Sequence, residues 1–243
     1  MAVAIVTGAG SGIGAATARA LSARGDSVVC ADIALETAEK TAQGLPGAIA
    51  ARVDVSDARS CAEMVALAVE RFGAVDGIAT CAGIEIHGSG EDFEEADFDR
   101  IMDVNLKGTW LCARALARHL IAAGRHGTVV MIGSINSIVG NPGAAAYCAS
   151  KGGVLMLGKT LALDWAPHGI RVNIVGPGVV DTPMSARSLA IPERRARMMD
   201  RTPLRRPAAA AEIASVVAFL MSDASSFVTG AYVPVDGGAL AAW

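Results

Sequence analysis

The segment VAIVTGAGSGIG, residues 3–14, decides the fold. Its first part, Val3–Thr7, is apolar almost throughout, which is typical of a strand buried on both faces of a sheet. Glycines at 8, 10, 12 and 14 then allow a tight turn, and a stretch with helical spacing follows. A strand that enters a helix through such a turn directs backbone N–H groups at a phosphate. The segment therefore predicts the dinucleotide-binding turn of an α/β sheet.

The rest of the chain repeats the same alternation of apolar runs and helical stretches. The expected strands are Val3–Thr7, Ser27–Asp32, Ile49–Val53, Gly77–Thr80, Thr128–Ile132, Arg171–Val175 and Tyr232–Val235. The expected helices cover residues 13–24, 34–43, 57–72, 97–123, 144–166 and 209–221. This order predicts an α/β fold: one doubly wound Rossmann-type domain over residues 1–243, with a mostly parallel sheet of about seven strands flanked by helices.

Composition excludes several classes of protein. Of 243 residues, 52% are hydrophobic, so the chain is not disordered, and a net charge of −3 argues against nucleic acid or an anionic membrane as partner. Five cysteines without a C-x-x-C pair indicate a reducing compartment rather than a disulfide framework. The sequence shows no signal-peptide pattern and no apolar run that spans a bilayer, so we expect a cytoplasmic protein. The four histidines lack metal-ligand spacing, and no catalytic metal is expected.

Asp32 indicates which dinucleotide binds. It ends the second expected strand, 18 positions after Gly14, where an acid accepts hydrogen bonds from the ribose hydroxyls. A carboxylate there would repel the 2′-phosphate of NADP, and the next residue, Ile33, is not a base. The pattern favours NAD as cofactor; the alternative is a solvated carboxylate at a strand end.

Tyr147 and Lys151 are four residues apart, so they share one face of a helix. A phenol with an ordinary pKa of about 10 works as a base near neutral pH only if nearby positive charge stabilises its anion. The Lys151 ammonium and an oxidised nicotinamide are two such charges. The alternative is an ordinary amphipathic helix with a half-buried tyrosine and a lysine whose stem lies along it.

These motifs together resemble the short-chain dehydrogenase/reductase family over essentially the whole chain. The family's glycine motif, Asp–Val pair, helix Asn, catalytic Ser, Pro–Gly turn and C-terminal motifs occur here in the family's order. They match Thr7, Gly8, Gly12 and Gly14; Asp54 and Val55; Asn105; Ser134; Pro177, Gly178 and Thr182; Thr229 and Gly230; and Val235, Asp236, Gly237 and Gly238. Without the resemblance, Ser134 would be a residue of a strand-end turn and Asn105 a satisfied helix amide.

The resemblance implies a catalytic set of Asn105, Ser134, Tyr147 and Lys151. Tyr147 would exchange a proton with the substrate hydroxyl, and Ser134 would hold the substrate oxygen. Lys151 would lower the pKa of Tyr147 and bind the nicotinamide ribose, and Asn105 would order a water that links Lys151 to solvent. The implied cofactor-binding residues are Gly8, Ser11, Gly12, Ile13, Gly14, Asp32, Ile33, Asp54, Val55, Cys81, Ala82, Gly83, Tyr147, Lys151, Pro177, Gly178, Val180 and Thr182.

One motif departs from the family. Where the family has Asn-Ala-Gly, this chain has Cys81-Ala82-Gly83. In the family that Asn mainly steadies the central sheet near the cofactor. Cysteine is smaller and a weak hydrogen-bond former, so we expect a local effect on stability rather than on chemistry.

The segment at about 180–206 is expected to cover the substrate. Its charged side chains include seven arginines, at 187, 194, 195, 197, 201, 205 and 206. They form either the outer face of a surface helical lid or, in one case, a clamp for an anionic substrate group. Glu85, His87 and Asn141 are further candidates for the border of the pocket, although a solvated loop histidine is the simpler interpretation of His87.

The sequence thus favours an NAD-dependent oxidoreductase that interconverts a secondary alcohol and a ketone of a small or medium-sized molecule. One alternative is a 3-oxoacyl thioester reductase, acting on an acyl-carrier-protein or CoA ester. Another, of a different class, is a catalytically silent dinucleotide-binding scaffold. The helix at 144–166 carries apolar residues on more than one face. One face is expected to pair with a second subunit in a homo-oligomer, and the resemblance implies a tetramer or a dimer; the alternative is a single buried helix.

Overall fold

The structure, a computed structural model, describes residues 2–242. Within these residues seven strands form one parallel sheet in the order β3-β2-β1-β4-β5-β6-β9. The strands are β1 Val3–Thr7, β2 Ser27–Asp32, β3 Ala48–Arg52, β4 Gly77–Thr80, β5 Gly127–Ile132, β6 Ile170–Pro177 and β9 Tyr232–Val235. The predicted fold class is confirmed, and the predicted strand bounds agree to within about two residues.

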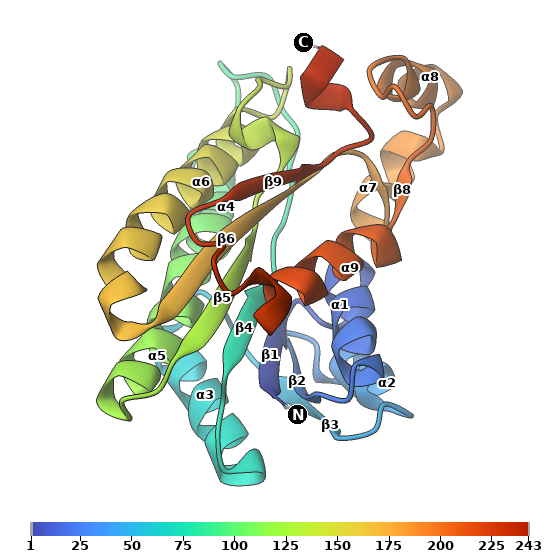
Figure 1. Ribbon diagram of the computed structural model, residues 1–243. Coiled ribbons are helices and arrows are strands. Elements are labelled where there is room, and N and C mark those ends of the chain that lie inside the picture. Colours follow the sequence, from blue (N-terminus) through green and yellow to red (C-terminus); the bar gives the residue numbers. More distant parts are fainter. Residues whose placement is uncertain (1, 243) are drawn as a thin grey trace.

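Helices cover both faces of this sheet (Figure 1). On one face lie α1 Gly12–Ala23, α2 Leu35–Ala42 and α9 Ala210–Leu220; on the other lie α3 Ala58–Phe72, α5 Gly108–Ala122 and α6 Ala145–Trp165. Each set packs its own apolar cluster against the strands, with Leu21 and Val217 buried on the first face and Leu116 and Val154 on the second. Because side chains alternate across a strand, each strand supplies residues to both clusters.

The predicted helix 97–123 consists of three pieces. These are α4 Glu95–Ile101, a π-helical turn Met102–Lys107, and α5. Gly108 starts α5 where an added Cβ would meet Val55 Cγ2 at 2.9 Å, so only a glycine lets the helix approach that loop closely. A π-turn of this kind has no signature in apolar spacing, and such turns are frequent at functional sites.

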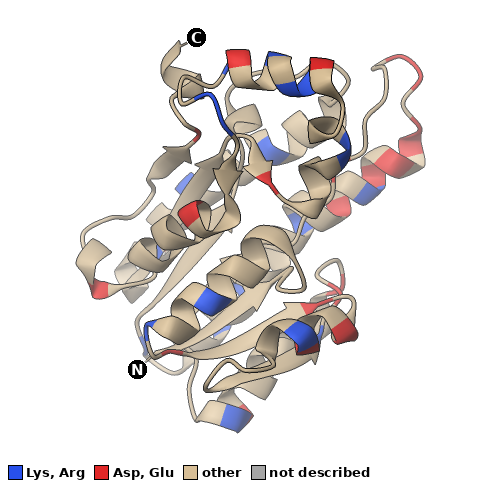
Figure 2. Cartoon of the chain, turned by 90° about the vertical axis from the view of Figure 1, so that its right-hand side faces the viewer, with Lys and Arg blue, Asp and Glu red and all other residues tan. Residues whose placement is uncertain are grey.

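The segment between β6 and α9 leaves the sheet as an excursion. Two short parallel strands, β7 Val180–Asp181 and β8 Ala208–Ala209, pair at its base. Between them lie α7 Pro183–Leu189 and α8 Pro192–Asp200, and α8 carries charges of both signs (Figure 2). The predicted substrate-covering segment is therefore helical, and the two-residue strands at its base are too short for a sequence pattern to reveal.

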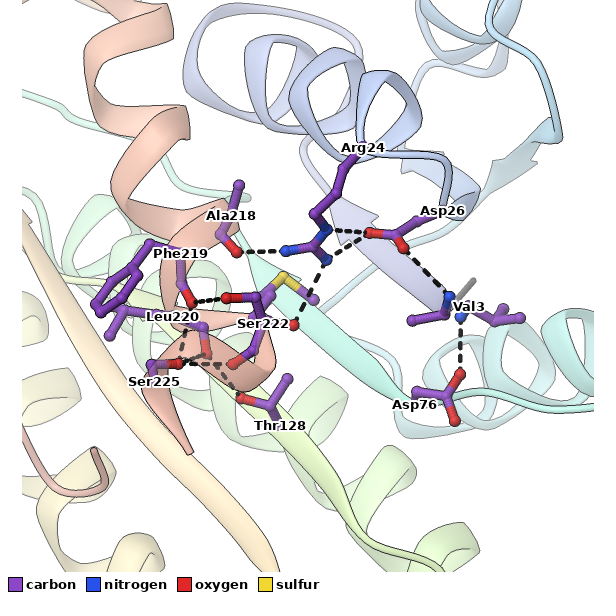
Figure 3. Close-up of polar contacts among 12 residues, drawn as sticks. Val3, Arg24, Asp26, Asp76, Thr128, Ala218, Phe219, Leu220, Ser222 and Ser225 are labelled. Atoms are coloured by element: carbon purple, nitrogen blue, oxygen red, sulfur yellow. Dashed lines mark hydrogen bonds and ion pairs between the residues drawn. The ribbon is translucent and has the colours of Figure 1, made fainter. Parts of the chain in front are cut away.

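A polar network fixes the sheet at its opposite edge, the amino ends of the strands (Figure 3). Arg24, at the end of α1, forms an ion pair with Asp26 and donates to the carbonyl oxygens of Ala218 and Met221 at the end of α9. Asp76 Oδ2 accepts a hydrogen bond from the Val3 N–H at 2.8 Å. These polar contacts occupy the amino ends of the strands. In sheets of this kind ligands bind at the opposite side, beyond the carboxyl ends of the strands. Every helix within residues 2–242 is too short or too polar to cross a membrane.

Candidate active site

A cavity of about 820 Å³ opens at the carboxyl ends of β1, β2, β3 and β4. A smaller cavity, of about 250 Å³, adjoins it at the ends of β5 and β6. The two share the lining residues Ile13, Cys81, Gly83, Thr182 and Met184. Every predicted cofactor-binding residue lines at least one of the two cavities. Most line the larger cavity, and Ile13, Cys81, Gly83 and Thr182 line both. The residues that line only the smaller cavity are Tyr147, Lys151, Pro177, Gly178 and Val180.

The glycine turn leaves the N-terminus of α1 open to the larger cavity. Ser11 precedes the helix, but its side chain makes no capping hydrogen bond, so within residues 2–242 the N–H groups of the first turn have no intrahelical or side-chain acceptor. Gly8 has a φ of +63°, and an added Cβ there would lie 2.8 Å from the Ala82 backbone. The N–H groups, the positive end of the helix and the lack of side chains fit a pyrophosphate. These residues therefore suit the dinucleotide that the sequence predicts.

Gly14 allows the closest approach in this turn, because an added Cβ would lie 2.1 Å from the Gly8 carbonyl oxygen. We expect Gly14→Ala to displace the turn, lower the free energy of unfolding by about 1–3 kcal/mol and weaken dinucleotide binding at least tenfold. Chemical denaturation and a titration with NAD measure the two effects. Gly90→Ala is the matched control, because no atom lies within 4 Å of the added Cβ and its φ is not positive. Equal behaviour of the two variants would contradict the argument.

Asp32 is held rigidly at the wall of the larger cavity. Its Oδ2 accepts a hydrogen bond from Gly10 N at 2.9 Å and its Oδ1 accepts one from Ala34 N at 3.0 Å. The neighbouring Ile33 side chain is 56% exposed. Among the described residues, the charged ones that line this cavity are Asp32, Asp54, Asp99, Asp103 and Arg100. Four carboxylates against one guanidinium make this wall more favourable to ribose hydroxyls than to a further phosphate.

Asp54 and Val55 line the same cavity after β3. Asp54 Oδ1 accepts hydrogen bonds from the backbone N–H and the hydroxyl of Ser56, at 2.9 and 2.6 Å, and these bonds lower the pKa of Asp54. The carboxylate thereby fixes the loop that follows the strand. Val55 is 8% exposed and packs beside Gly108 at the start of α5.

Ser134, Tyr147 and Lys151 come together in the smaller cavity. Ser134 follows β5, and its Oγ accepts a hydrogen bond from Asn136 N at 3.1 Å. Tyr147 and Lys151 lie on α6, with Lys151 Nζ 5.7 Å from the centre of the Tyr147 ring. The Lys151 ammonium donates to the Ile132 carbonyl oxygen at 2.9 Å. The structure thus brings the predicted hydroxyl, phenol and amine to one place.

The pKa of Tyr147 is shifted upward, whereas the sequence led us to expect a downward shift. Burial raises it above its ordinary value, the Glu85 carboxylate raises it further, and the Ser134 hydroxyl opposes both. Lys151 is not among the groups that shift this pKa, and its ammonium donates a hydrogen bond to the Ile132 carbonyl oxygen. Burial also lowers the pKa of Lys151 to about 8, which leaves the amine largely protonated at neutral pH.

Asn105 lies in the π-helical turn and is fully buried. Its Oδ1 accepts from Ile84 N at 2.8 Å, while its Nδ2 donates to Ile84 O at 2.9 Å and to Ser150 Oγ at 3.1 Å. The carboxamide therefore joins the segment after β4 to α6, beside Lys151. That positioning function is visible in the structure, and the water-ordering function implied by the resemblance stays a prediction.

Sequence analysis missed Tyr232, the other tyrosine of the chain. From β9 it lies across Gly176, where an added Cβ would meet the phenol oxygen at 2.1 Å, and it donates to the Ser134 carbonyl oxygen at 2.8 Å. This bond helps to hold the Ser134 backbone in place. The contact crosses 98 residues of sequence, so no local spacing points to it.

The arginines of the covering segment separate into different environments. Of the seven, Arg201 alone is among the described residues that line the smaller cavity. Arg205 pairs with Asp200 and Arg206 with Glu212, each at 2.7 Å. Glu85 and Asn141 also line the cavity, whereas His87 does not and instead contacts Glu85. Within residues 2–242, no three His, Cys, Asp or Glu side chains are placed to hold a metal ion.

Cys81 leaves a polar neighbour poorly satisfied. Burial raises the pKa of the Cys81 thiol to about 12, so it is a protonated, weak hydrogen-bonding group. Near it, the buried Thr17 Oγ1 makes no hydrogen bond of ordinary length within residues 2–242. A buried hydroxyl without a partner costs free energy. The departure from the family's asparagine therefore has a physical cost at Thr17.

We expect Cys81→Asn to supply a hydrogen bond to Thr17 and to raise the free energy of unfolding by about 1 kcal/mol. For a chain of this length that corresponds to an increase in Tm of about 2–4 °C, measured by calorimetry. Cys81→Ala offers no hydrogen bond and serves as the control. An unchanged or lower Tm for Cys81→Asn would show that the cavity wall does not accept the larger side chain.

Comparison with known proteins agrees with this geometry. The sequence profile of the family described as enoyl-(acyl carrier protein) reductase matches residues 8–239. The cis-4-hydroxycyclohexanecarboxylate dehydrogenase of Sinomonas cyclohexanicum is 43% identical over 97% of this chain and 95% of its own. The 3-oxoacyl-[acyl-carrier-protein] reductase of Thermotoga maritima is 38% identical over 97% and 96%.

A solved structure extends the likeness to the fold. The gluconate 5-dehydrogenase of Burkholderia cenocepacia, crystallised with NADP and tartrate, superposes with a TM-score of 0.93. It is 35% identical in sequence, and the match covers 99% of this chain and 95% of that one. The similar proteins thus include dehydrogenases and a reductase that are named for different substrates.

Proposed function

The chain belongs to the short-chain dehydrogenase/reductase family, and the relatives compared above oxidise or form CH–OH groups. We propose that it is an NAD-dependent enzyme that interconverts a secondary alcohol and a ketone. The observation that carries the proposal is the meeting of Ser134, Tyr147 and Lys151 in a cavity that adjoins the open N-terminus of α1. A dinucleotide-binding scaffold without catalysis has no need of those three side chains in one cavity.

The residues of the smaller cavity supply acid/base chemistry. NAD⁺ bound in the larger cavity would accept a hydride from the carbinol carbon. Tyr147 takes the proton of the substrate hydroxyl, while Ser134 hydrogen-bonds the same oxygen and stabilises charge that develops on it. Lys151 does not lower the pKa of Tyr147 in this structure, so the positive charge that stabilises the phenolate would be that of the oxidised nicotinamide, whose ribose Lys151 would bind. In the reverse direction Tyr147 returns the proton to the carbonyl oxygen.

NAD is the proposed cofactor because of Asp32. Its carboxylate is held by two backbone N–H groups, so it would keep its orientation toward the ribose of a dinucleotide bound in the larger cavity. The gluconate 5-dehydrogenase was crystallised with NADP on the same fold, so the fold alone does not fix the cofactor, and the proposal rests on the Asp32 wall. Kinetics with each cofactor test the proposal.

The substrate is proposed to be a small or medium-sized secondary alcohol, since the smaller cavity measures about 250 Å³. NADH oxidation with a panel of ketones tests the reaction. The alternative is a 3-oxoacyl thioester reductase, as the Thermotoga maritima relative is named. Faster turnover of acetoacetyl-CoA with NADPH than of any simple ketone with NADH would favour that alternative. No turnover of any ketone would favour the scaffold.

We further propose a cytoplasmic homo-oligomer, a tetramer or a dimer. The support is α6, whose buried face packs on the sheet while Met156 and Leu163, on the other side, are 59% and 77% exposed. Exposed apolar side chains of this size on one helix are typical of a subunit contact. A sedimentation measurement that gives the mass of a single chain would contradict it.

A further inference from the structure

The proposed acid/base chemistry makes no use of Glu85, although this residue lines the same cavity as Ser134 and Tyr147. Its side chain is only 20% exposed. A carboxylate is costly to bury without partners, and burial raises the pKa of Glu85. Its place in the cavity therefore calls for an explanation of its own.

Contacts at Ile84, Gly88 and His87 hold Glu85 in position. The preceding residue, Ile84, is bound on both its N–H and its carbonyl oxygen by Asn105. Farther along, Gly88 N donates to Gly143 O at 3.0 Å, which ties the segment to the loop before α6. His87 Nε2 lies 3.2 Å from Glu85 Oε1 and thereby orients the carboxylate. The side chain is thus a preorganised acceptor rather than a mobile surface acid.

Glu85 is close to the reacting groups. Its charge raises the pKa of Tyr147 and also that of Lys151, so its field reaches both ends of the catalytic set. The same cavity is also lined by Asn141 and Arg201 and by the apolar side chains of Ile135, Val139 and Met198. A substrate whose oxygen lies between Ser134 and Tyr147 would therefore share the cavity with an oriented carboxylate.

A carboxylate at that place distinguishes between substrate groups. A carboxylate accepts a hydrogen bond from a hydroxyl and repels a second carboxylate. We propose that Glu85 is a specificity-determining residue that accepts a hydrogen bond from a second hydroxyl beside the reacting carbon. The preferred substrates are then vicinal diols and the corresponding hydroxy ketones, and an anionic group at that place is rejected. This inference rests on the proposed function and adds the substrate class.

Three four-carbon ketones of similar size test it: 3-hydroxybutan-2-one, butan-2-one and acetoacetate. For each, kcat/KM is measured with NADH for the wild type, Glu85→Gln and Glu85→Leu. In the wild type we expect 3-hydroxybutan-2-one to be preferred over butan-2-one about 10- to 100-fold, the range for a hydrogen bond to a charged group. Glu85→Leu, of similar size, should abolish this preference, and Glu85→Gln should reduce it. Both variants should raise the acetoacetate to butan-2-one ratio about tenfold.

Glu91→Gln is the matched control, because Glu91 is exposed on the same segment and lines neither cavity. It removes the same charge and should leave both ratios unchanged. A purely structural function of Glu85 would lower kcat/KM for all three ketones together without altering the ratios, and that result overturns the inference. So does a wild type that reduces butan-2-one as fast as its hydroxylated analogue, although the proposed function then stands.

A second measurement does not depend on turnover. Butane-2,3-diol should raise the Tm of the NAD-loaded wild type more than butan-2-ol does at equal concentration, because ligand that binds the folded state stabilises it. The difference should vanish in Glu85→Leu and persist in Glu91→Gln. Equal shifts from the two alcohols in the wild type would overturn the inference. Failure to oxidise NADH with any ketone would overturn the proposed function as well.

Discussion

Tyr147→Phe is expected to lower kcat by about 10²- to 10⁴-fold while NAD binds as it does to the wild type. The substitution removes one hydroxyl and keeps the ring, so the packing of α6 is preserved. What is lost is the group beside Ser134 that we propose exchanges a proton with the substrate oxygen. Steady-state turnover and a calorimetric titration with NAD measure the two quantities separately.

The chain offers a matched control for this variant. Tyr232 is the other tyrosine, and its hydroxyl donates to the Ser134 carbonyl oxygen. Tyr232→Phe makes the same chemical change at a group that positions Ser134 without touching the reacting atoms. It should lower kcat much less than Tyr147→Phe, by about tenfold or less. Near-native turnover of Tyr147→Phe would remove the phenol from the mechanism.

The double variant Asp32→Ser, Ile33→Arg is expected to move cofactor preference from NAD toward NADP by about 10²- to 10³-fold in kcat/KM. Two effects act in the same direction: a carboxylate that repels the 2′-phosphate is removed, and a guanidinium that pairs with it is added. At a separation of about 4 Å near a protein surface, one such charge pair is worth about 4 kcal/mol before screening and ordering reduce it. The introduced serine retains a hydroxyl that can accept the Gly10 N–H.

Ile33→Arg alone is the control that separates the two effects. With Asp32 in place, the new guanidinium is partly neutralised by its neighbour, so the change in preference should be smaller. Because Asp32 also orders Gly10 and Ala34, thermal unfolding of each variant must show a folded protein. An unchanged ratio of NAD to NADP activity in a folded double variant would refute the function assigned to Asp32.

Local patterns predicted most of the scaffold. Strands such as Ser27–Asp32 are buried on both faces, so their apolar runs are unbroken and easy to detect, and the bounds agree. The glycine turn was equally easy to detect in the sequence. Gly8 and Gly14 lie so close to backbone atoms that no side chain fits, so both positions require glycine. The π-helical turn and the strands β7 and β8 were not predicted, since hydrogen bonds shifted by one residue and two-residue strands leave no periodic signal.

The sequence by itself determined the order of strands and helices, the phosphate-binding turn, and the four-residue spacing of Tyr147 and Lys151 on one helix face, because each depends on neighbours along the chain. Only the tertiary structure decided the electrostatics of the site. Folding half-buries Tyr147 within reach of the Glu85 charge, directs Lys151 at Ile132, and binds Asn105 to Ile84. These contacts join segments 19 to about 60 residues apart, and a pKa depends on burial and on charges close in space, which no local pattern contains.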